Sequence, residues 1–167
     1  AAPAPVEPAT APRVPDGARE VPVSLARRAI GRRLSESMRE APHFYVMGEV
    51  DLEAALARRA RLPAPQPRVN DLIQYLAVQA LRRVPELNAT YEDGRLFHYD
   101  AVHLGIAVAV DDGLITPVLP SAERYSLAGL AAESRALVER ARANRLHAGD
   151  LQPGTFTISN LGVVPQV

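Results

Sequence analysis

The chain has no cysteine and no lysine among its 167 residues, and all 19 of its basic residues are arginine. The absence of cysteine excludes disulfide bonds, thiolate metal sites and cysteine nucleophiles from this chain, and it suits a reducing compartment. The absence of lysine excludes a Schiff base, a Walker-type phosphate lysine and a lipoyl-lysine attachment site. Any chemistry of this chain must use other side chains.

Long apolar runs and an excess of charge are also missing. No stretch approaches the ~18 apolar residues that span a bilayer, and the first residues lack the basic-then-apolar pattern of a secretion signal. The formal net charge is +0, from 19 basic and 19 acidic residues, which disfavours nucleic acid as a partner. With 47% hydrophobic and 23% charged residues, we expect a soluble, cytoplasmic protein with a packed core and no membrane partner.

The beginning of the chain differs in composition from the rest. Alanine and proline dominate Ala1–Gly17, and such a tract favours extended, semi-rigid conformers over helix or sheet. It is either a disordered tail or part of a linker that ties a mobile domain to a core. We assign residues 1–20 to this Ala/Pro-rich linker and residues 21–167 to a single domain.

Helical periodicity is clear in several segments. Apolar residues recur at helical spacing in Ser24–Met38, in Asn70–Val84 and in a long segment from Ser126, and a short Ala/Arg-rich helix is expected at Leu52–Leu62. Ser24 has the side chain of an N-cap, and proline follows each of the first three helices in the chain.

Strand-like segments and turns fill most of the intervals. They are His43–Asp51, a hairpin of Ala89–Tyr91 and Arg95–Tyr99, a hairpin of Leu104–Val110 and Leu114–Leu119, a turn at His147–Gln152, and a last strand from about Thr155. The near-continuous apolar character of Leu104–Val110 predicts burial on both of its faces. Because helices and hairpins alternate without a regular βαβ repeat, the predicted class is mixed α/β with a partly antiparallel sheet.

Five stretches, in order, resemble the dihydrolipoamide acyltransferases, the core components of 2-oxo acid dehydrogenase complexes. They are Ala29–Leu34 with Ala41–Tyr45, then Val69–Ile73, Val84–Ala89, Asp112–Val118 and Gly154–Gly162, the last reading Gly-Thr-Phe-Thr-Ile-Ser-Asn-Leu-Gly. The resemblance covers nearly everything from Val21 onward. It implies the fold of chloramphenicol acetyltransferase and transfer of an acyl group between a dihydrolipoyl thiol and coenzyme A. It also implies a homotrimer within a larger core, a lipoyl group carried on another domain, other components of the complex as partners, and no metal.

The implied reaction needs a donor that stabilises a tetrahedral oxyanion and a base that forms a thiolate. Ser159 matches the family's serine whose hydroxyl is that donor, although a serine near the end of a strand is otherwise often satisfied by backbone groups. Arg59 matches the position at which an arginine meets a phosphate of coenzyme A. The alternative for Arg59 is a solvated helix face shared with Arg58 and Arg61. The pairs Arg27/Arg28 and Arg32/Arg33 are expected to be solvent-exposed or to form intersubunit ion pairs.

The catalytic base is not found in the sequence. In the family it is a histidine in a His-x-x-x-Asp-Gly or His-x-x-x-Asn-Gly motif beyond the serine motif, and this spacing does not occur here. We expect surface or packing roles for His43, His98, His103 and His147. We therefore expect a catalytic domain truncated at its C-terminus, with an incomplete sheet, inactive by itself and prone to associate through an exposed apolar sheet edge.

Two other functions stay open at this point. The chain is alternatively a non-catalytic core or scaffold component of the same kind of complex. It is alternatively an acetyltransferase of the chloramphenicol type that acts on a small alcohol, which the Ala/Pro-rich linker and the Ile115–Val118 segment disfavour.

Overall fold

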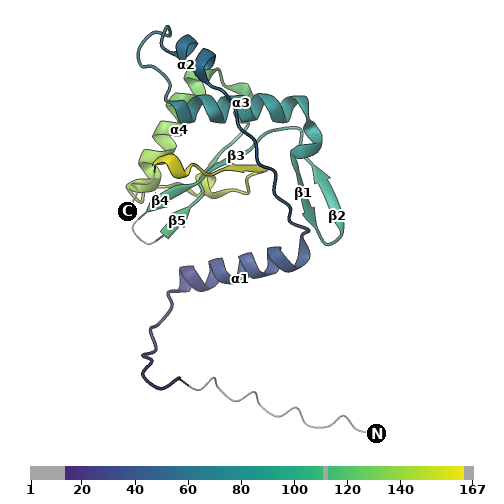
Figure 1. Ribbon diagram of the computed structural model, residues 1–167, viewed down its shortest axis with the longest axis vertical. Helices are drawn as coiled ribbons and strands as arrows, with labels where there is room; N and C mark the ends of the chain where they lie inside the picture. Colours follow the sequence, from purple (N-terminus) through teal and green to yellow (C-terminus); the bar gives the residue numbers. More distant parts are fainter. Residues whose placement is uncertain (1–13, 111–112, 164–167) are drawn as a thin grey trace. The chain divides into compact units, whose positions relative to one another are not determined.

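The computed structural model describes residues 14–110 and 113–163 (Figure 1). They fall into two units, one ending at His43 and one comprising Phe44–Val167. Residues 1–13 of the predicted linker lie outside the described residues, as do Asp111 and Asp112 of the predicted second hairpin.

Within residues 14–43, the first unit contains one helix, α1 (Leu25–Glu40). The Ser24 hydroxyl caps it by accepting a hydrogen bond from the Arg27 amide at 3.3 Å, and Pro42, which has no N–H, follows it. The predicted helix and its cap are confirmed. The four arginines at positions 27, 28, 32 and 33 are all exposed.

The second unit is built on two packed helices, α3 (Val69–Arg83) and α4 (Leu127–Arg142), and on three small sheets (Figure 1). Its core consists of buried apolar residues from both helices and from the central strand, among them Val78, Leu81, Leu104, Ile106, Leu130 and Leu137. A buried hydrogen bond from Ser134 Oγ to Gln74 Oε1, 2.7 Å long, joins the two helices. Both helices were predicted from their periodicity.

The largest sheet has three strands in the order β6, β3, β7. The central strand β3 (Leu104–Ile106) pairs antiparallel with β6 (Val118–Leu119) and parallel with β7 (Phe156–Ile158). Two antiparallel hairpins complete the strands: β1 (Ala89–Glu92) with β2 (Arg95–His98), and β4 (Val108–Val110) with β5 (Gly113–Ile115). The mixed α/β class with a partly antiparallel sheet is confirmed.

The predicted strand Leu104–Val110 is divided at Ala107: its first part, β3, pairs with β6 and β7, and its second part, β4, pairs with β5. The Ile106 amide donates to the Pro117 carbonyl at 2.9 Å, whereas the Ala107 amide donates to the Ile158 carbonyl at 3.0 Å. Pro117 has no N–H to extend the β3–β6 ladder. Burial on both faces is confirmed for β3, whereas Ala109 of β4 is exposed.

The prediction of a strand at His43–Asp51 is wrong. These residues have no regular secondary structure, and all of them are exposed. Figure 1 shows them within the extended connection that leads to α2 (Glu53–Arg59). The sequence has the composition of a strand, but a strand forms only where a neighbouring strand pairs with it.

Short turns complete the unit. The helix α2 ends three residues before its predicted limit, and the Gln66 side chain donates to the Ala60 and Leu62 carbonyls just beyond it. The 3-10 turns are η1 (Pro85–Leu87), η2 (Ala122–Arg124), η3 (Ala148–Leu151) at the predicted turn, and η4 (Leu161–Val163). No helix of the described residues has both the length and the apolar character of a membrane span.

Candidate functional site at the start of helix α3

Ser159 is the first residue beyond β7. The parallel ladder pairs Ile158 with Ile106, and the Ile158 carbonyl accepts the Ala107 amide. The backbone is therefore held in place up to the residue before Ser159, and the Ser159 side chain is exposed rather than packed in the core. An exposed hydroxyl at the end of a fixed strand is available to a ligand.

Asn160 holds the chain on the other side of Ser159. Its Nδ2 donates to Asn70 Oδ1 at 2.9 Å, and its Oδ1 accepts the Gly162 amide at 2.8 Å. Asn70 lies in the first turn of α3, so one side chain joins the end of β7 to the start of α3 over 90 residues of sequence. The sequence analysis did not identify Asn160 and Asn70 as partners, although each lies in one of the motifs that carried the resemblance.

Arg59 approaches the same end of α3 from α2. Its Nε donates to the carbonyl of Pro67, which is buried and directly precedes the N-cap residue Arg68. Arg59 is half-buried, whereas its neighbours Arg58 and Arg61 are exposed. The hydrogen bond fixes the base of the guanidinium, and its terminal nitrogens are the groups that bind an anion in a bidentate manner.

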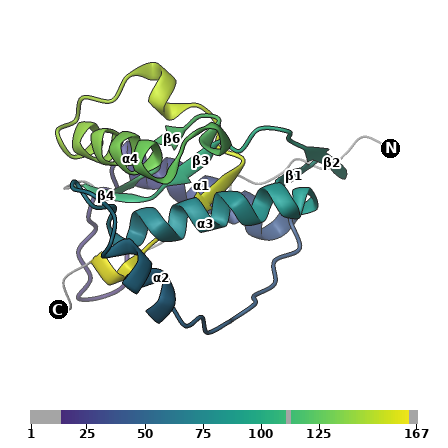
Figure 2. The same ribbon diagram turned by 90° about the horizontal axis from the view of Figure 1, so that it is seen from above.

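These two contacts bring the predicted site residues to one place in the fold. Pro67, the partner of Arg59, and Asn70, the partner of Asn160, lie three residues apart in the sequence at the beginning of α3. The carboxylate of Asp71 is buried there and accepts the Arg68 amide at 2.7 Å, which satisfies one of the open amides of the first helical turn. The Asn160–Asn70 hydrogen bond thus puts the residues just beyond β7 beside the start of α3 (Figure 2).

The four histidines lie elsewhere. His43 is exposed in the first unit, and His98 is exposed at the end of β2. His103 is half-buried, and its Nδ1 accepts the Ser121 amide at 3.2 Å. His147 is exposed, with Nδ1 3.5 Å from Asp150 Oδ2. No described hydrogen bond or ion pair connects a histidine to Ser159.

The carboxylate beside His147 already has a stronger partner. Arg140 donates to both oxygens of Asp150, at 3.0 and 2.8 Å. This hydrogen-bonded pair lowers the pKa of Asp150 and raises the pKa of Arg140, with the His147 amide as a further donor that lowers the pKa of Asp150. The group therefore joins α4 to η3 and is a structural feature. Across residues 14–110 and 113–163, no three His, Asp or Glu side chains gather as metal ligands would.

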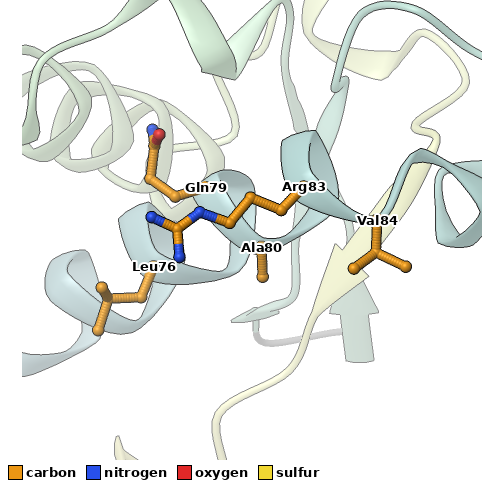
Figure 3. A pocket seen from close by; sticks show the side chains of 5 residues that line it. All are labelled: Leu76, Gln79, Ala80, Arg83 and Val84. Carbon is orange, nitrogen blue, oxygen red and sulfur yellow. The ribbon is translucent and has the colours of Figure 1, made fainter.

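A shallow concavity lies on α3, toward the other end of the helix (Figure 3). Its volume is about 360 Å³, and its lining residues are Leu76, Gln79, Ala80, Arg83 and Val84. Ser159 and Arg59 are not among them. The concavity is therefore distinct from the residues gathered at the start of α3.

The sequence matches a family model over residues 15–166, that of the 2-oxoacid dehydrogenases acyltransferase catalytic domain. This chain belongs to that family. The chain is 39% identical over 151 residues to the mitochondrial dihydrolipoyllysine-residue acetyltransferase component of the pyruvate dehydrogenase complex of Schizosaccharomyces pombe, and the match covers 87% of this chain and 31% of that protein. It is 34% identical over 158 residues to the corresponding component of Rickettsia bellii, covering 90% of this chain and 38% of that protein.

Solved structures of acyltransferase cores have the same fold. The dihydrolipoamide acetyltransferase of Azotobacter vinelandii, studied for the catalytic roles of a serine, a histidine and an asparagine, has a TM-score of 0.80 at 28% identity over 94% of this chain and 71% of that one. A truncated catalytic core from Thermoplasma acidophilum has a TM-score of 0.77 at 31% identity over 86% of this chain and 69% of that one. The predicted family and the predicted acyltransferase fold are thus confirmed. This chain spans about a third of the length of the curated relatives.

Proposed function

We propose that this chain forms part of the core of a 2-oxo acid dehydrogenase complex and takes part in acyl transfer between a dihydrolipoyl thiol and coenzyme A. In this proposal the Ser159 hydroxyl donates a hydrogen bond to the oxyanion of the tetrahedral intermediate. Arg59 binds a phosphate of coenzyme A, which is a substrate. The observation that carries the proposal is the family match over residues 15–166, joined to the contacts that bring Ser159 and Arg59 to the start of α3.

The chemistry follows from thiol attack on a thioester. Attack by the thiolate sulfur on the carbonyl carbon breaks the carbonyl π bond and puts negative charge on the oxygen, and collapse of this intermediate expels the other thiolate. A hydroxyl donor lowers the barrier because its hydrogen bond strengthens as the charge develops, an effect worth roughly 3 kcal/mol in other enzymes. Ser159 supports this role because its hydroxyl is exposed and the residues on both sides of it are held by hydrogen bonds.

The base is a separate requirement. None of the four histidines of the sequence lies in the family's His-x-x-x-Asp-Gly pattern, so in this proposal the imidazole comes from outside these 167 residues. The lipoyl group is carried by another domain, and the working assembly is a homotrimer within a larger core, bound to other components of the complex in the cytoplasm. The pyruvate dehydrogenase core with a cubic assembly, which resembles this chain with a TM-score of 0.80, supports the assembly.

An assay at high pH tests acyl transfer without needing the absent base. Raising the pH increases the ionised fraction of the dihydrolipoamide thiol, so transfer of acetyl from acetyl-CoA to dihydrolipoamide then depends less on a base and more on binding and oxyanion stabilisation. We expect the transfer rate with the chain to exceed the uncatalysed rate. For the Ser159→Ala variant we expect this rate excess to be roughly 100-fold smaller. The Thr157→Ala variant, which changes an exposed hydroxyl two residues away, is the matched control and is expected to retain the excess.

The second candidate function is a scaffold component, and the positions of the histidines favour it. If the chain is a scaffold, the transfer rate equals the uncatalysed rate for wild type and both variants, and coenzyme A does not bind. That outcome would contradict the proposed acyl transfer while leaving the family assignment intact.

A further inference from the structure

The hydrogen bond between Asn160 and Asn70 has a fixed direction, because a backbone amide sets it. The Gly162 N–H group only donates, so the atom of Asn160 that it meets at 2.8 Å is the acceptor Oδ1. The other end of the Asn160 amide is therefore the donor Nδ2, which meets Asn70 at 2.9 Å. Asn70 must present its acceptor, Oδ1, to that donor. One backbone group thus sets the orientation of two side-chain amides in turn.

The amide nitrogen of Asn70 is left available to a ligand. Because the contact with Asn160 uses only Oδ1, it uses neither of the N–H groups on Asn70 Nδ2. Within residues 14–110 and 113–163, no group accepts a hydrogen bond from this nitrogen. The buried side-chain atoms without a partner in the same ranges are Asn88 Oδ1 and Arg135 Nε, so Asn70 Nδ2 is not buried and solvent reaches it. The half-buried Asn70 therefore presents an oriented and accessible donor.

Asn70 lies between the two residues that the proposed function assigns to the ends of one ligand. Arg59 bonds to the carbonyl of Pro67, three residues before Asn70, and three steps of about 3.8 Å span at most about 11 Å. Asn160, which bonds to Asn70, is the direct neighbour of Ser159. Figures 1 and 2 show α2 and the yellow segment beyond β7 at the same end of α3. A ligand that reaches from Arg59 to Ser159 therefore passes the first turn of α3.

Acyl-CoA carries hydrogen-bond acceptors along this part of its length. Coenzyme A has its phosphates at one end and its thiol at the other, and the arm between them contains two amide groups. The acyl group adds a thioester. Each of these groups has a carbonyl oxygen, which loses binding free energy if it leaves water without a donor. A neutral donor that is oriented before binding suits such a carbonyl, because the donor is ordered during folding and not during binding.

We propose that Asn70 Nδ2 donates a hydrogen bond to a carbonyl oxygen of acyl-CoA, which is the thioester carbonyl or an amide carbonyl of the arm. In this role Asn70 contacts the ligand itself, and Asn160 is a positioning residue that orients the Asn70 amide. The inference rests on the proposed function, because it adds a third contact to the same substrate. It goes beyond that function by giving Asn70 a role in binding that its place in a motif does not indicate.

The variant Asn70→Asp tests the donor separately from the contact with Asn160. A carboxylate keeps an oxygen that accepts from Asn160 Nδ2, and it replaces the free donor by a second acceptor of similar shape. We expect this variant to keep the melting temperature of wild type and to bind acetyl-CoA roughly three- to tenfold more weakly in calorimetric titrations. Asn70→Ala removes both groups, so it is expected to lower the melting temperature as well.

Two ligands distinguish the carbonyl groups. Coenzyme A has the amide carbonyls of the arm but no thioester. If Asn70→Asp weakens the binding of acetyl-CoA alone, the acceptor is the thioester carbonyl. If it weakens the binding of acetyl-CoA and coenzyme A equally, the acceptor is an amide of the arm. Either result supports the proposed contact.

The negative charge of Asn70→Asp needs a control, because the phosphates of the ligand are also negative. Gln79→Glu makes the same change from amide to carboxylate further along α3, and it is expected to leave binding unchanged. Salt screens repulsion between charges, whereas the loss of a hydrogen-bond donor persists. We therefore expect the ratio of the wild-type and Asn70→Asp affinities to stay above about threefold between about 0.1 and 0.5 M salt. A ratio that falls to one overturns the inference.

Nuclear magnetic resonance of the wild-type chain gives a measurement that needs no loss of function. Asn70→Asp removes one pair of side-chain NH₂ signals from the proton–nitrogen correlation spectrum and so assigns it, and we expect this pair to shift when acetyl-CoA is added. If the wild type binds acetyl-CoA without this shift, or if Asn70→Asp binds both ligands as tightly as wild type, the inference is overturned and the proposed function stands. If the wild type binds neither ligand, the proposed function is overturned together with the inference.

Discussion

At the scale of single residues, the site depends on a few polar contacts that hold exposed groups in position. Ser159 lies between the end of a parallel ladder and Asn160, whose side chain is bonded to Asn70, and Arg59 is held through its Nε. In each case a hydrogen bond holds the residue or its neighbour, while Ser159 is exposed and Arg59 is half-buried. Such positioning is what an oxyanion donor or an anion-binding group requires, because the cost of ordering is met during folding rather than during the reaction.

Gly105 gives a residue-scale prediction about the sheet that carries Ser159. A methyl group at this position would lie 2.8 Å from Thr157 Oγ1 and 3.0 Å from Thr116 Cγ2, and Gly105 is buried between two strands. We expect Gly105→Ala to lower the free energy of unfolding by about 1–3 kcal/mol, measured by urea denaturation. At Gly149 a methyl group meets nothing within 4 Å, so Gly149→Ala should change the free energy of unfolding by less than about 0.5 kcal/mol. Equal effects of the two substitutions would contradict the close packing around β3.

At the scale of secondary-structure elements, local patterns and long-range contacts differ in how well the sequence reveals them. The helices α3 and α4 follow from a periodicity that is complete within each segment, and the Ser24 cap follows from its neighbours. The pairing of β3 with β7 joins residues about 50 positions apart, and periodicity carries no signal for it. The wrong prediction at residues 43–51 has the same cause, since strand formation depends on a partner that the segment's own sequence does not specify.

In the candidate site, too, the sequence indicates single residues but not the long-range contacts between them. Ser159 was predicted from its place in the Gly154–Gly162 motif, and Arg59 was predicted from its position in the family pattern. Their supporting contacts with Asn70 and Pro67 could not be identified, because they depend on how α2, α3 and β7 meet in space. The half-burial of Arg59 is likewise a property of the fold, and it is what distinguishes Arg59 from Arg58 and Arg61.

The ion pair between α4 and η3 gives an element-scale prediction for pH. The hydrogen bonds from Arg140 lower the pKa of Asp150 in the folded chain, so the pair stabilises the fold above the unfolded pKa of about 3.9. This stabilisation is lost as the pH falls through the lower folded pKa. We expect Asp150→Asn to reduce the free energy of unfolding by about 1 kcal/mol at neutral pH, and the difference from wild type to shrink below about pH 4.

The control for this prediction is Glu139→Gln, at an exposed position on α4 next to Arg140. Its effect on the free energy of unfolding should be small at both pH values. If the free energy of unfolding of Asp150→Asn differs from that of wild type by the same amount at neutral and acidic pH, the carboxylate charge does not stabilise the contact between α4 and η3.

At the scale of the whole molecule, the chain combines a family assignment with many exposed apolar side chains among its described residues. The structural match with the Azotobacter vinelandii acetyltransferase covers 94% of this chain and 71% of that one. Residues 44–50 are exposed in the second unit, as are the apolar residues Ile73 and Leu76 of α3.

The central claim is that the start of α3 is a ligand site in which Arg59 receives a phosphate of coenzyme A. Calorimetric titration of coenzyme A into the chain and into its Arg59→Gln and Arg58→Gln variants tests this directly. We predict that Arg59→Gln weakens binding about tenfold or more, equivalent to at least ~1.4 kcal/mol, and that Arg58→Gln, at an exposed neighbouring position, leaves binding unchanged. Equal affinities for both variants, or no binding by the wild type, would contradict the account.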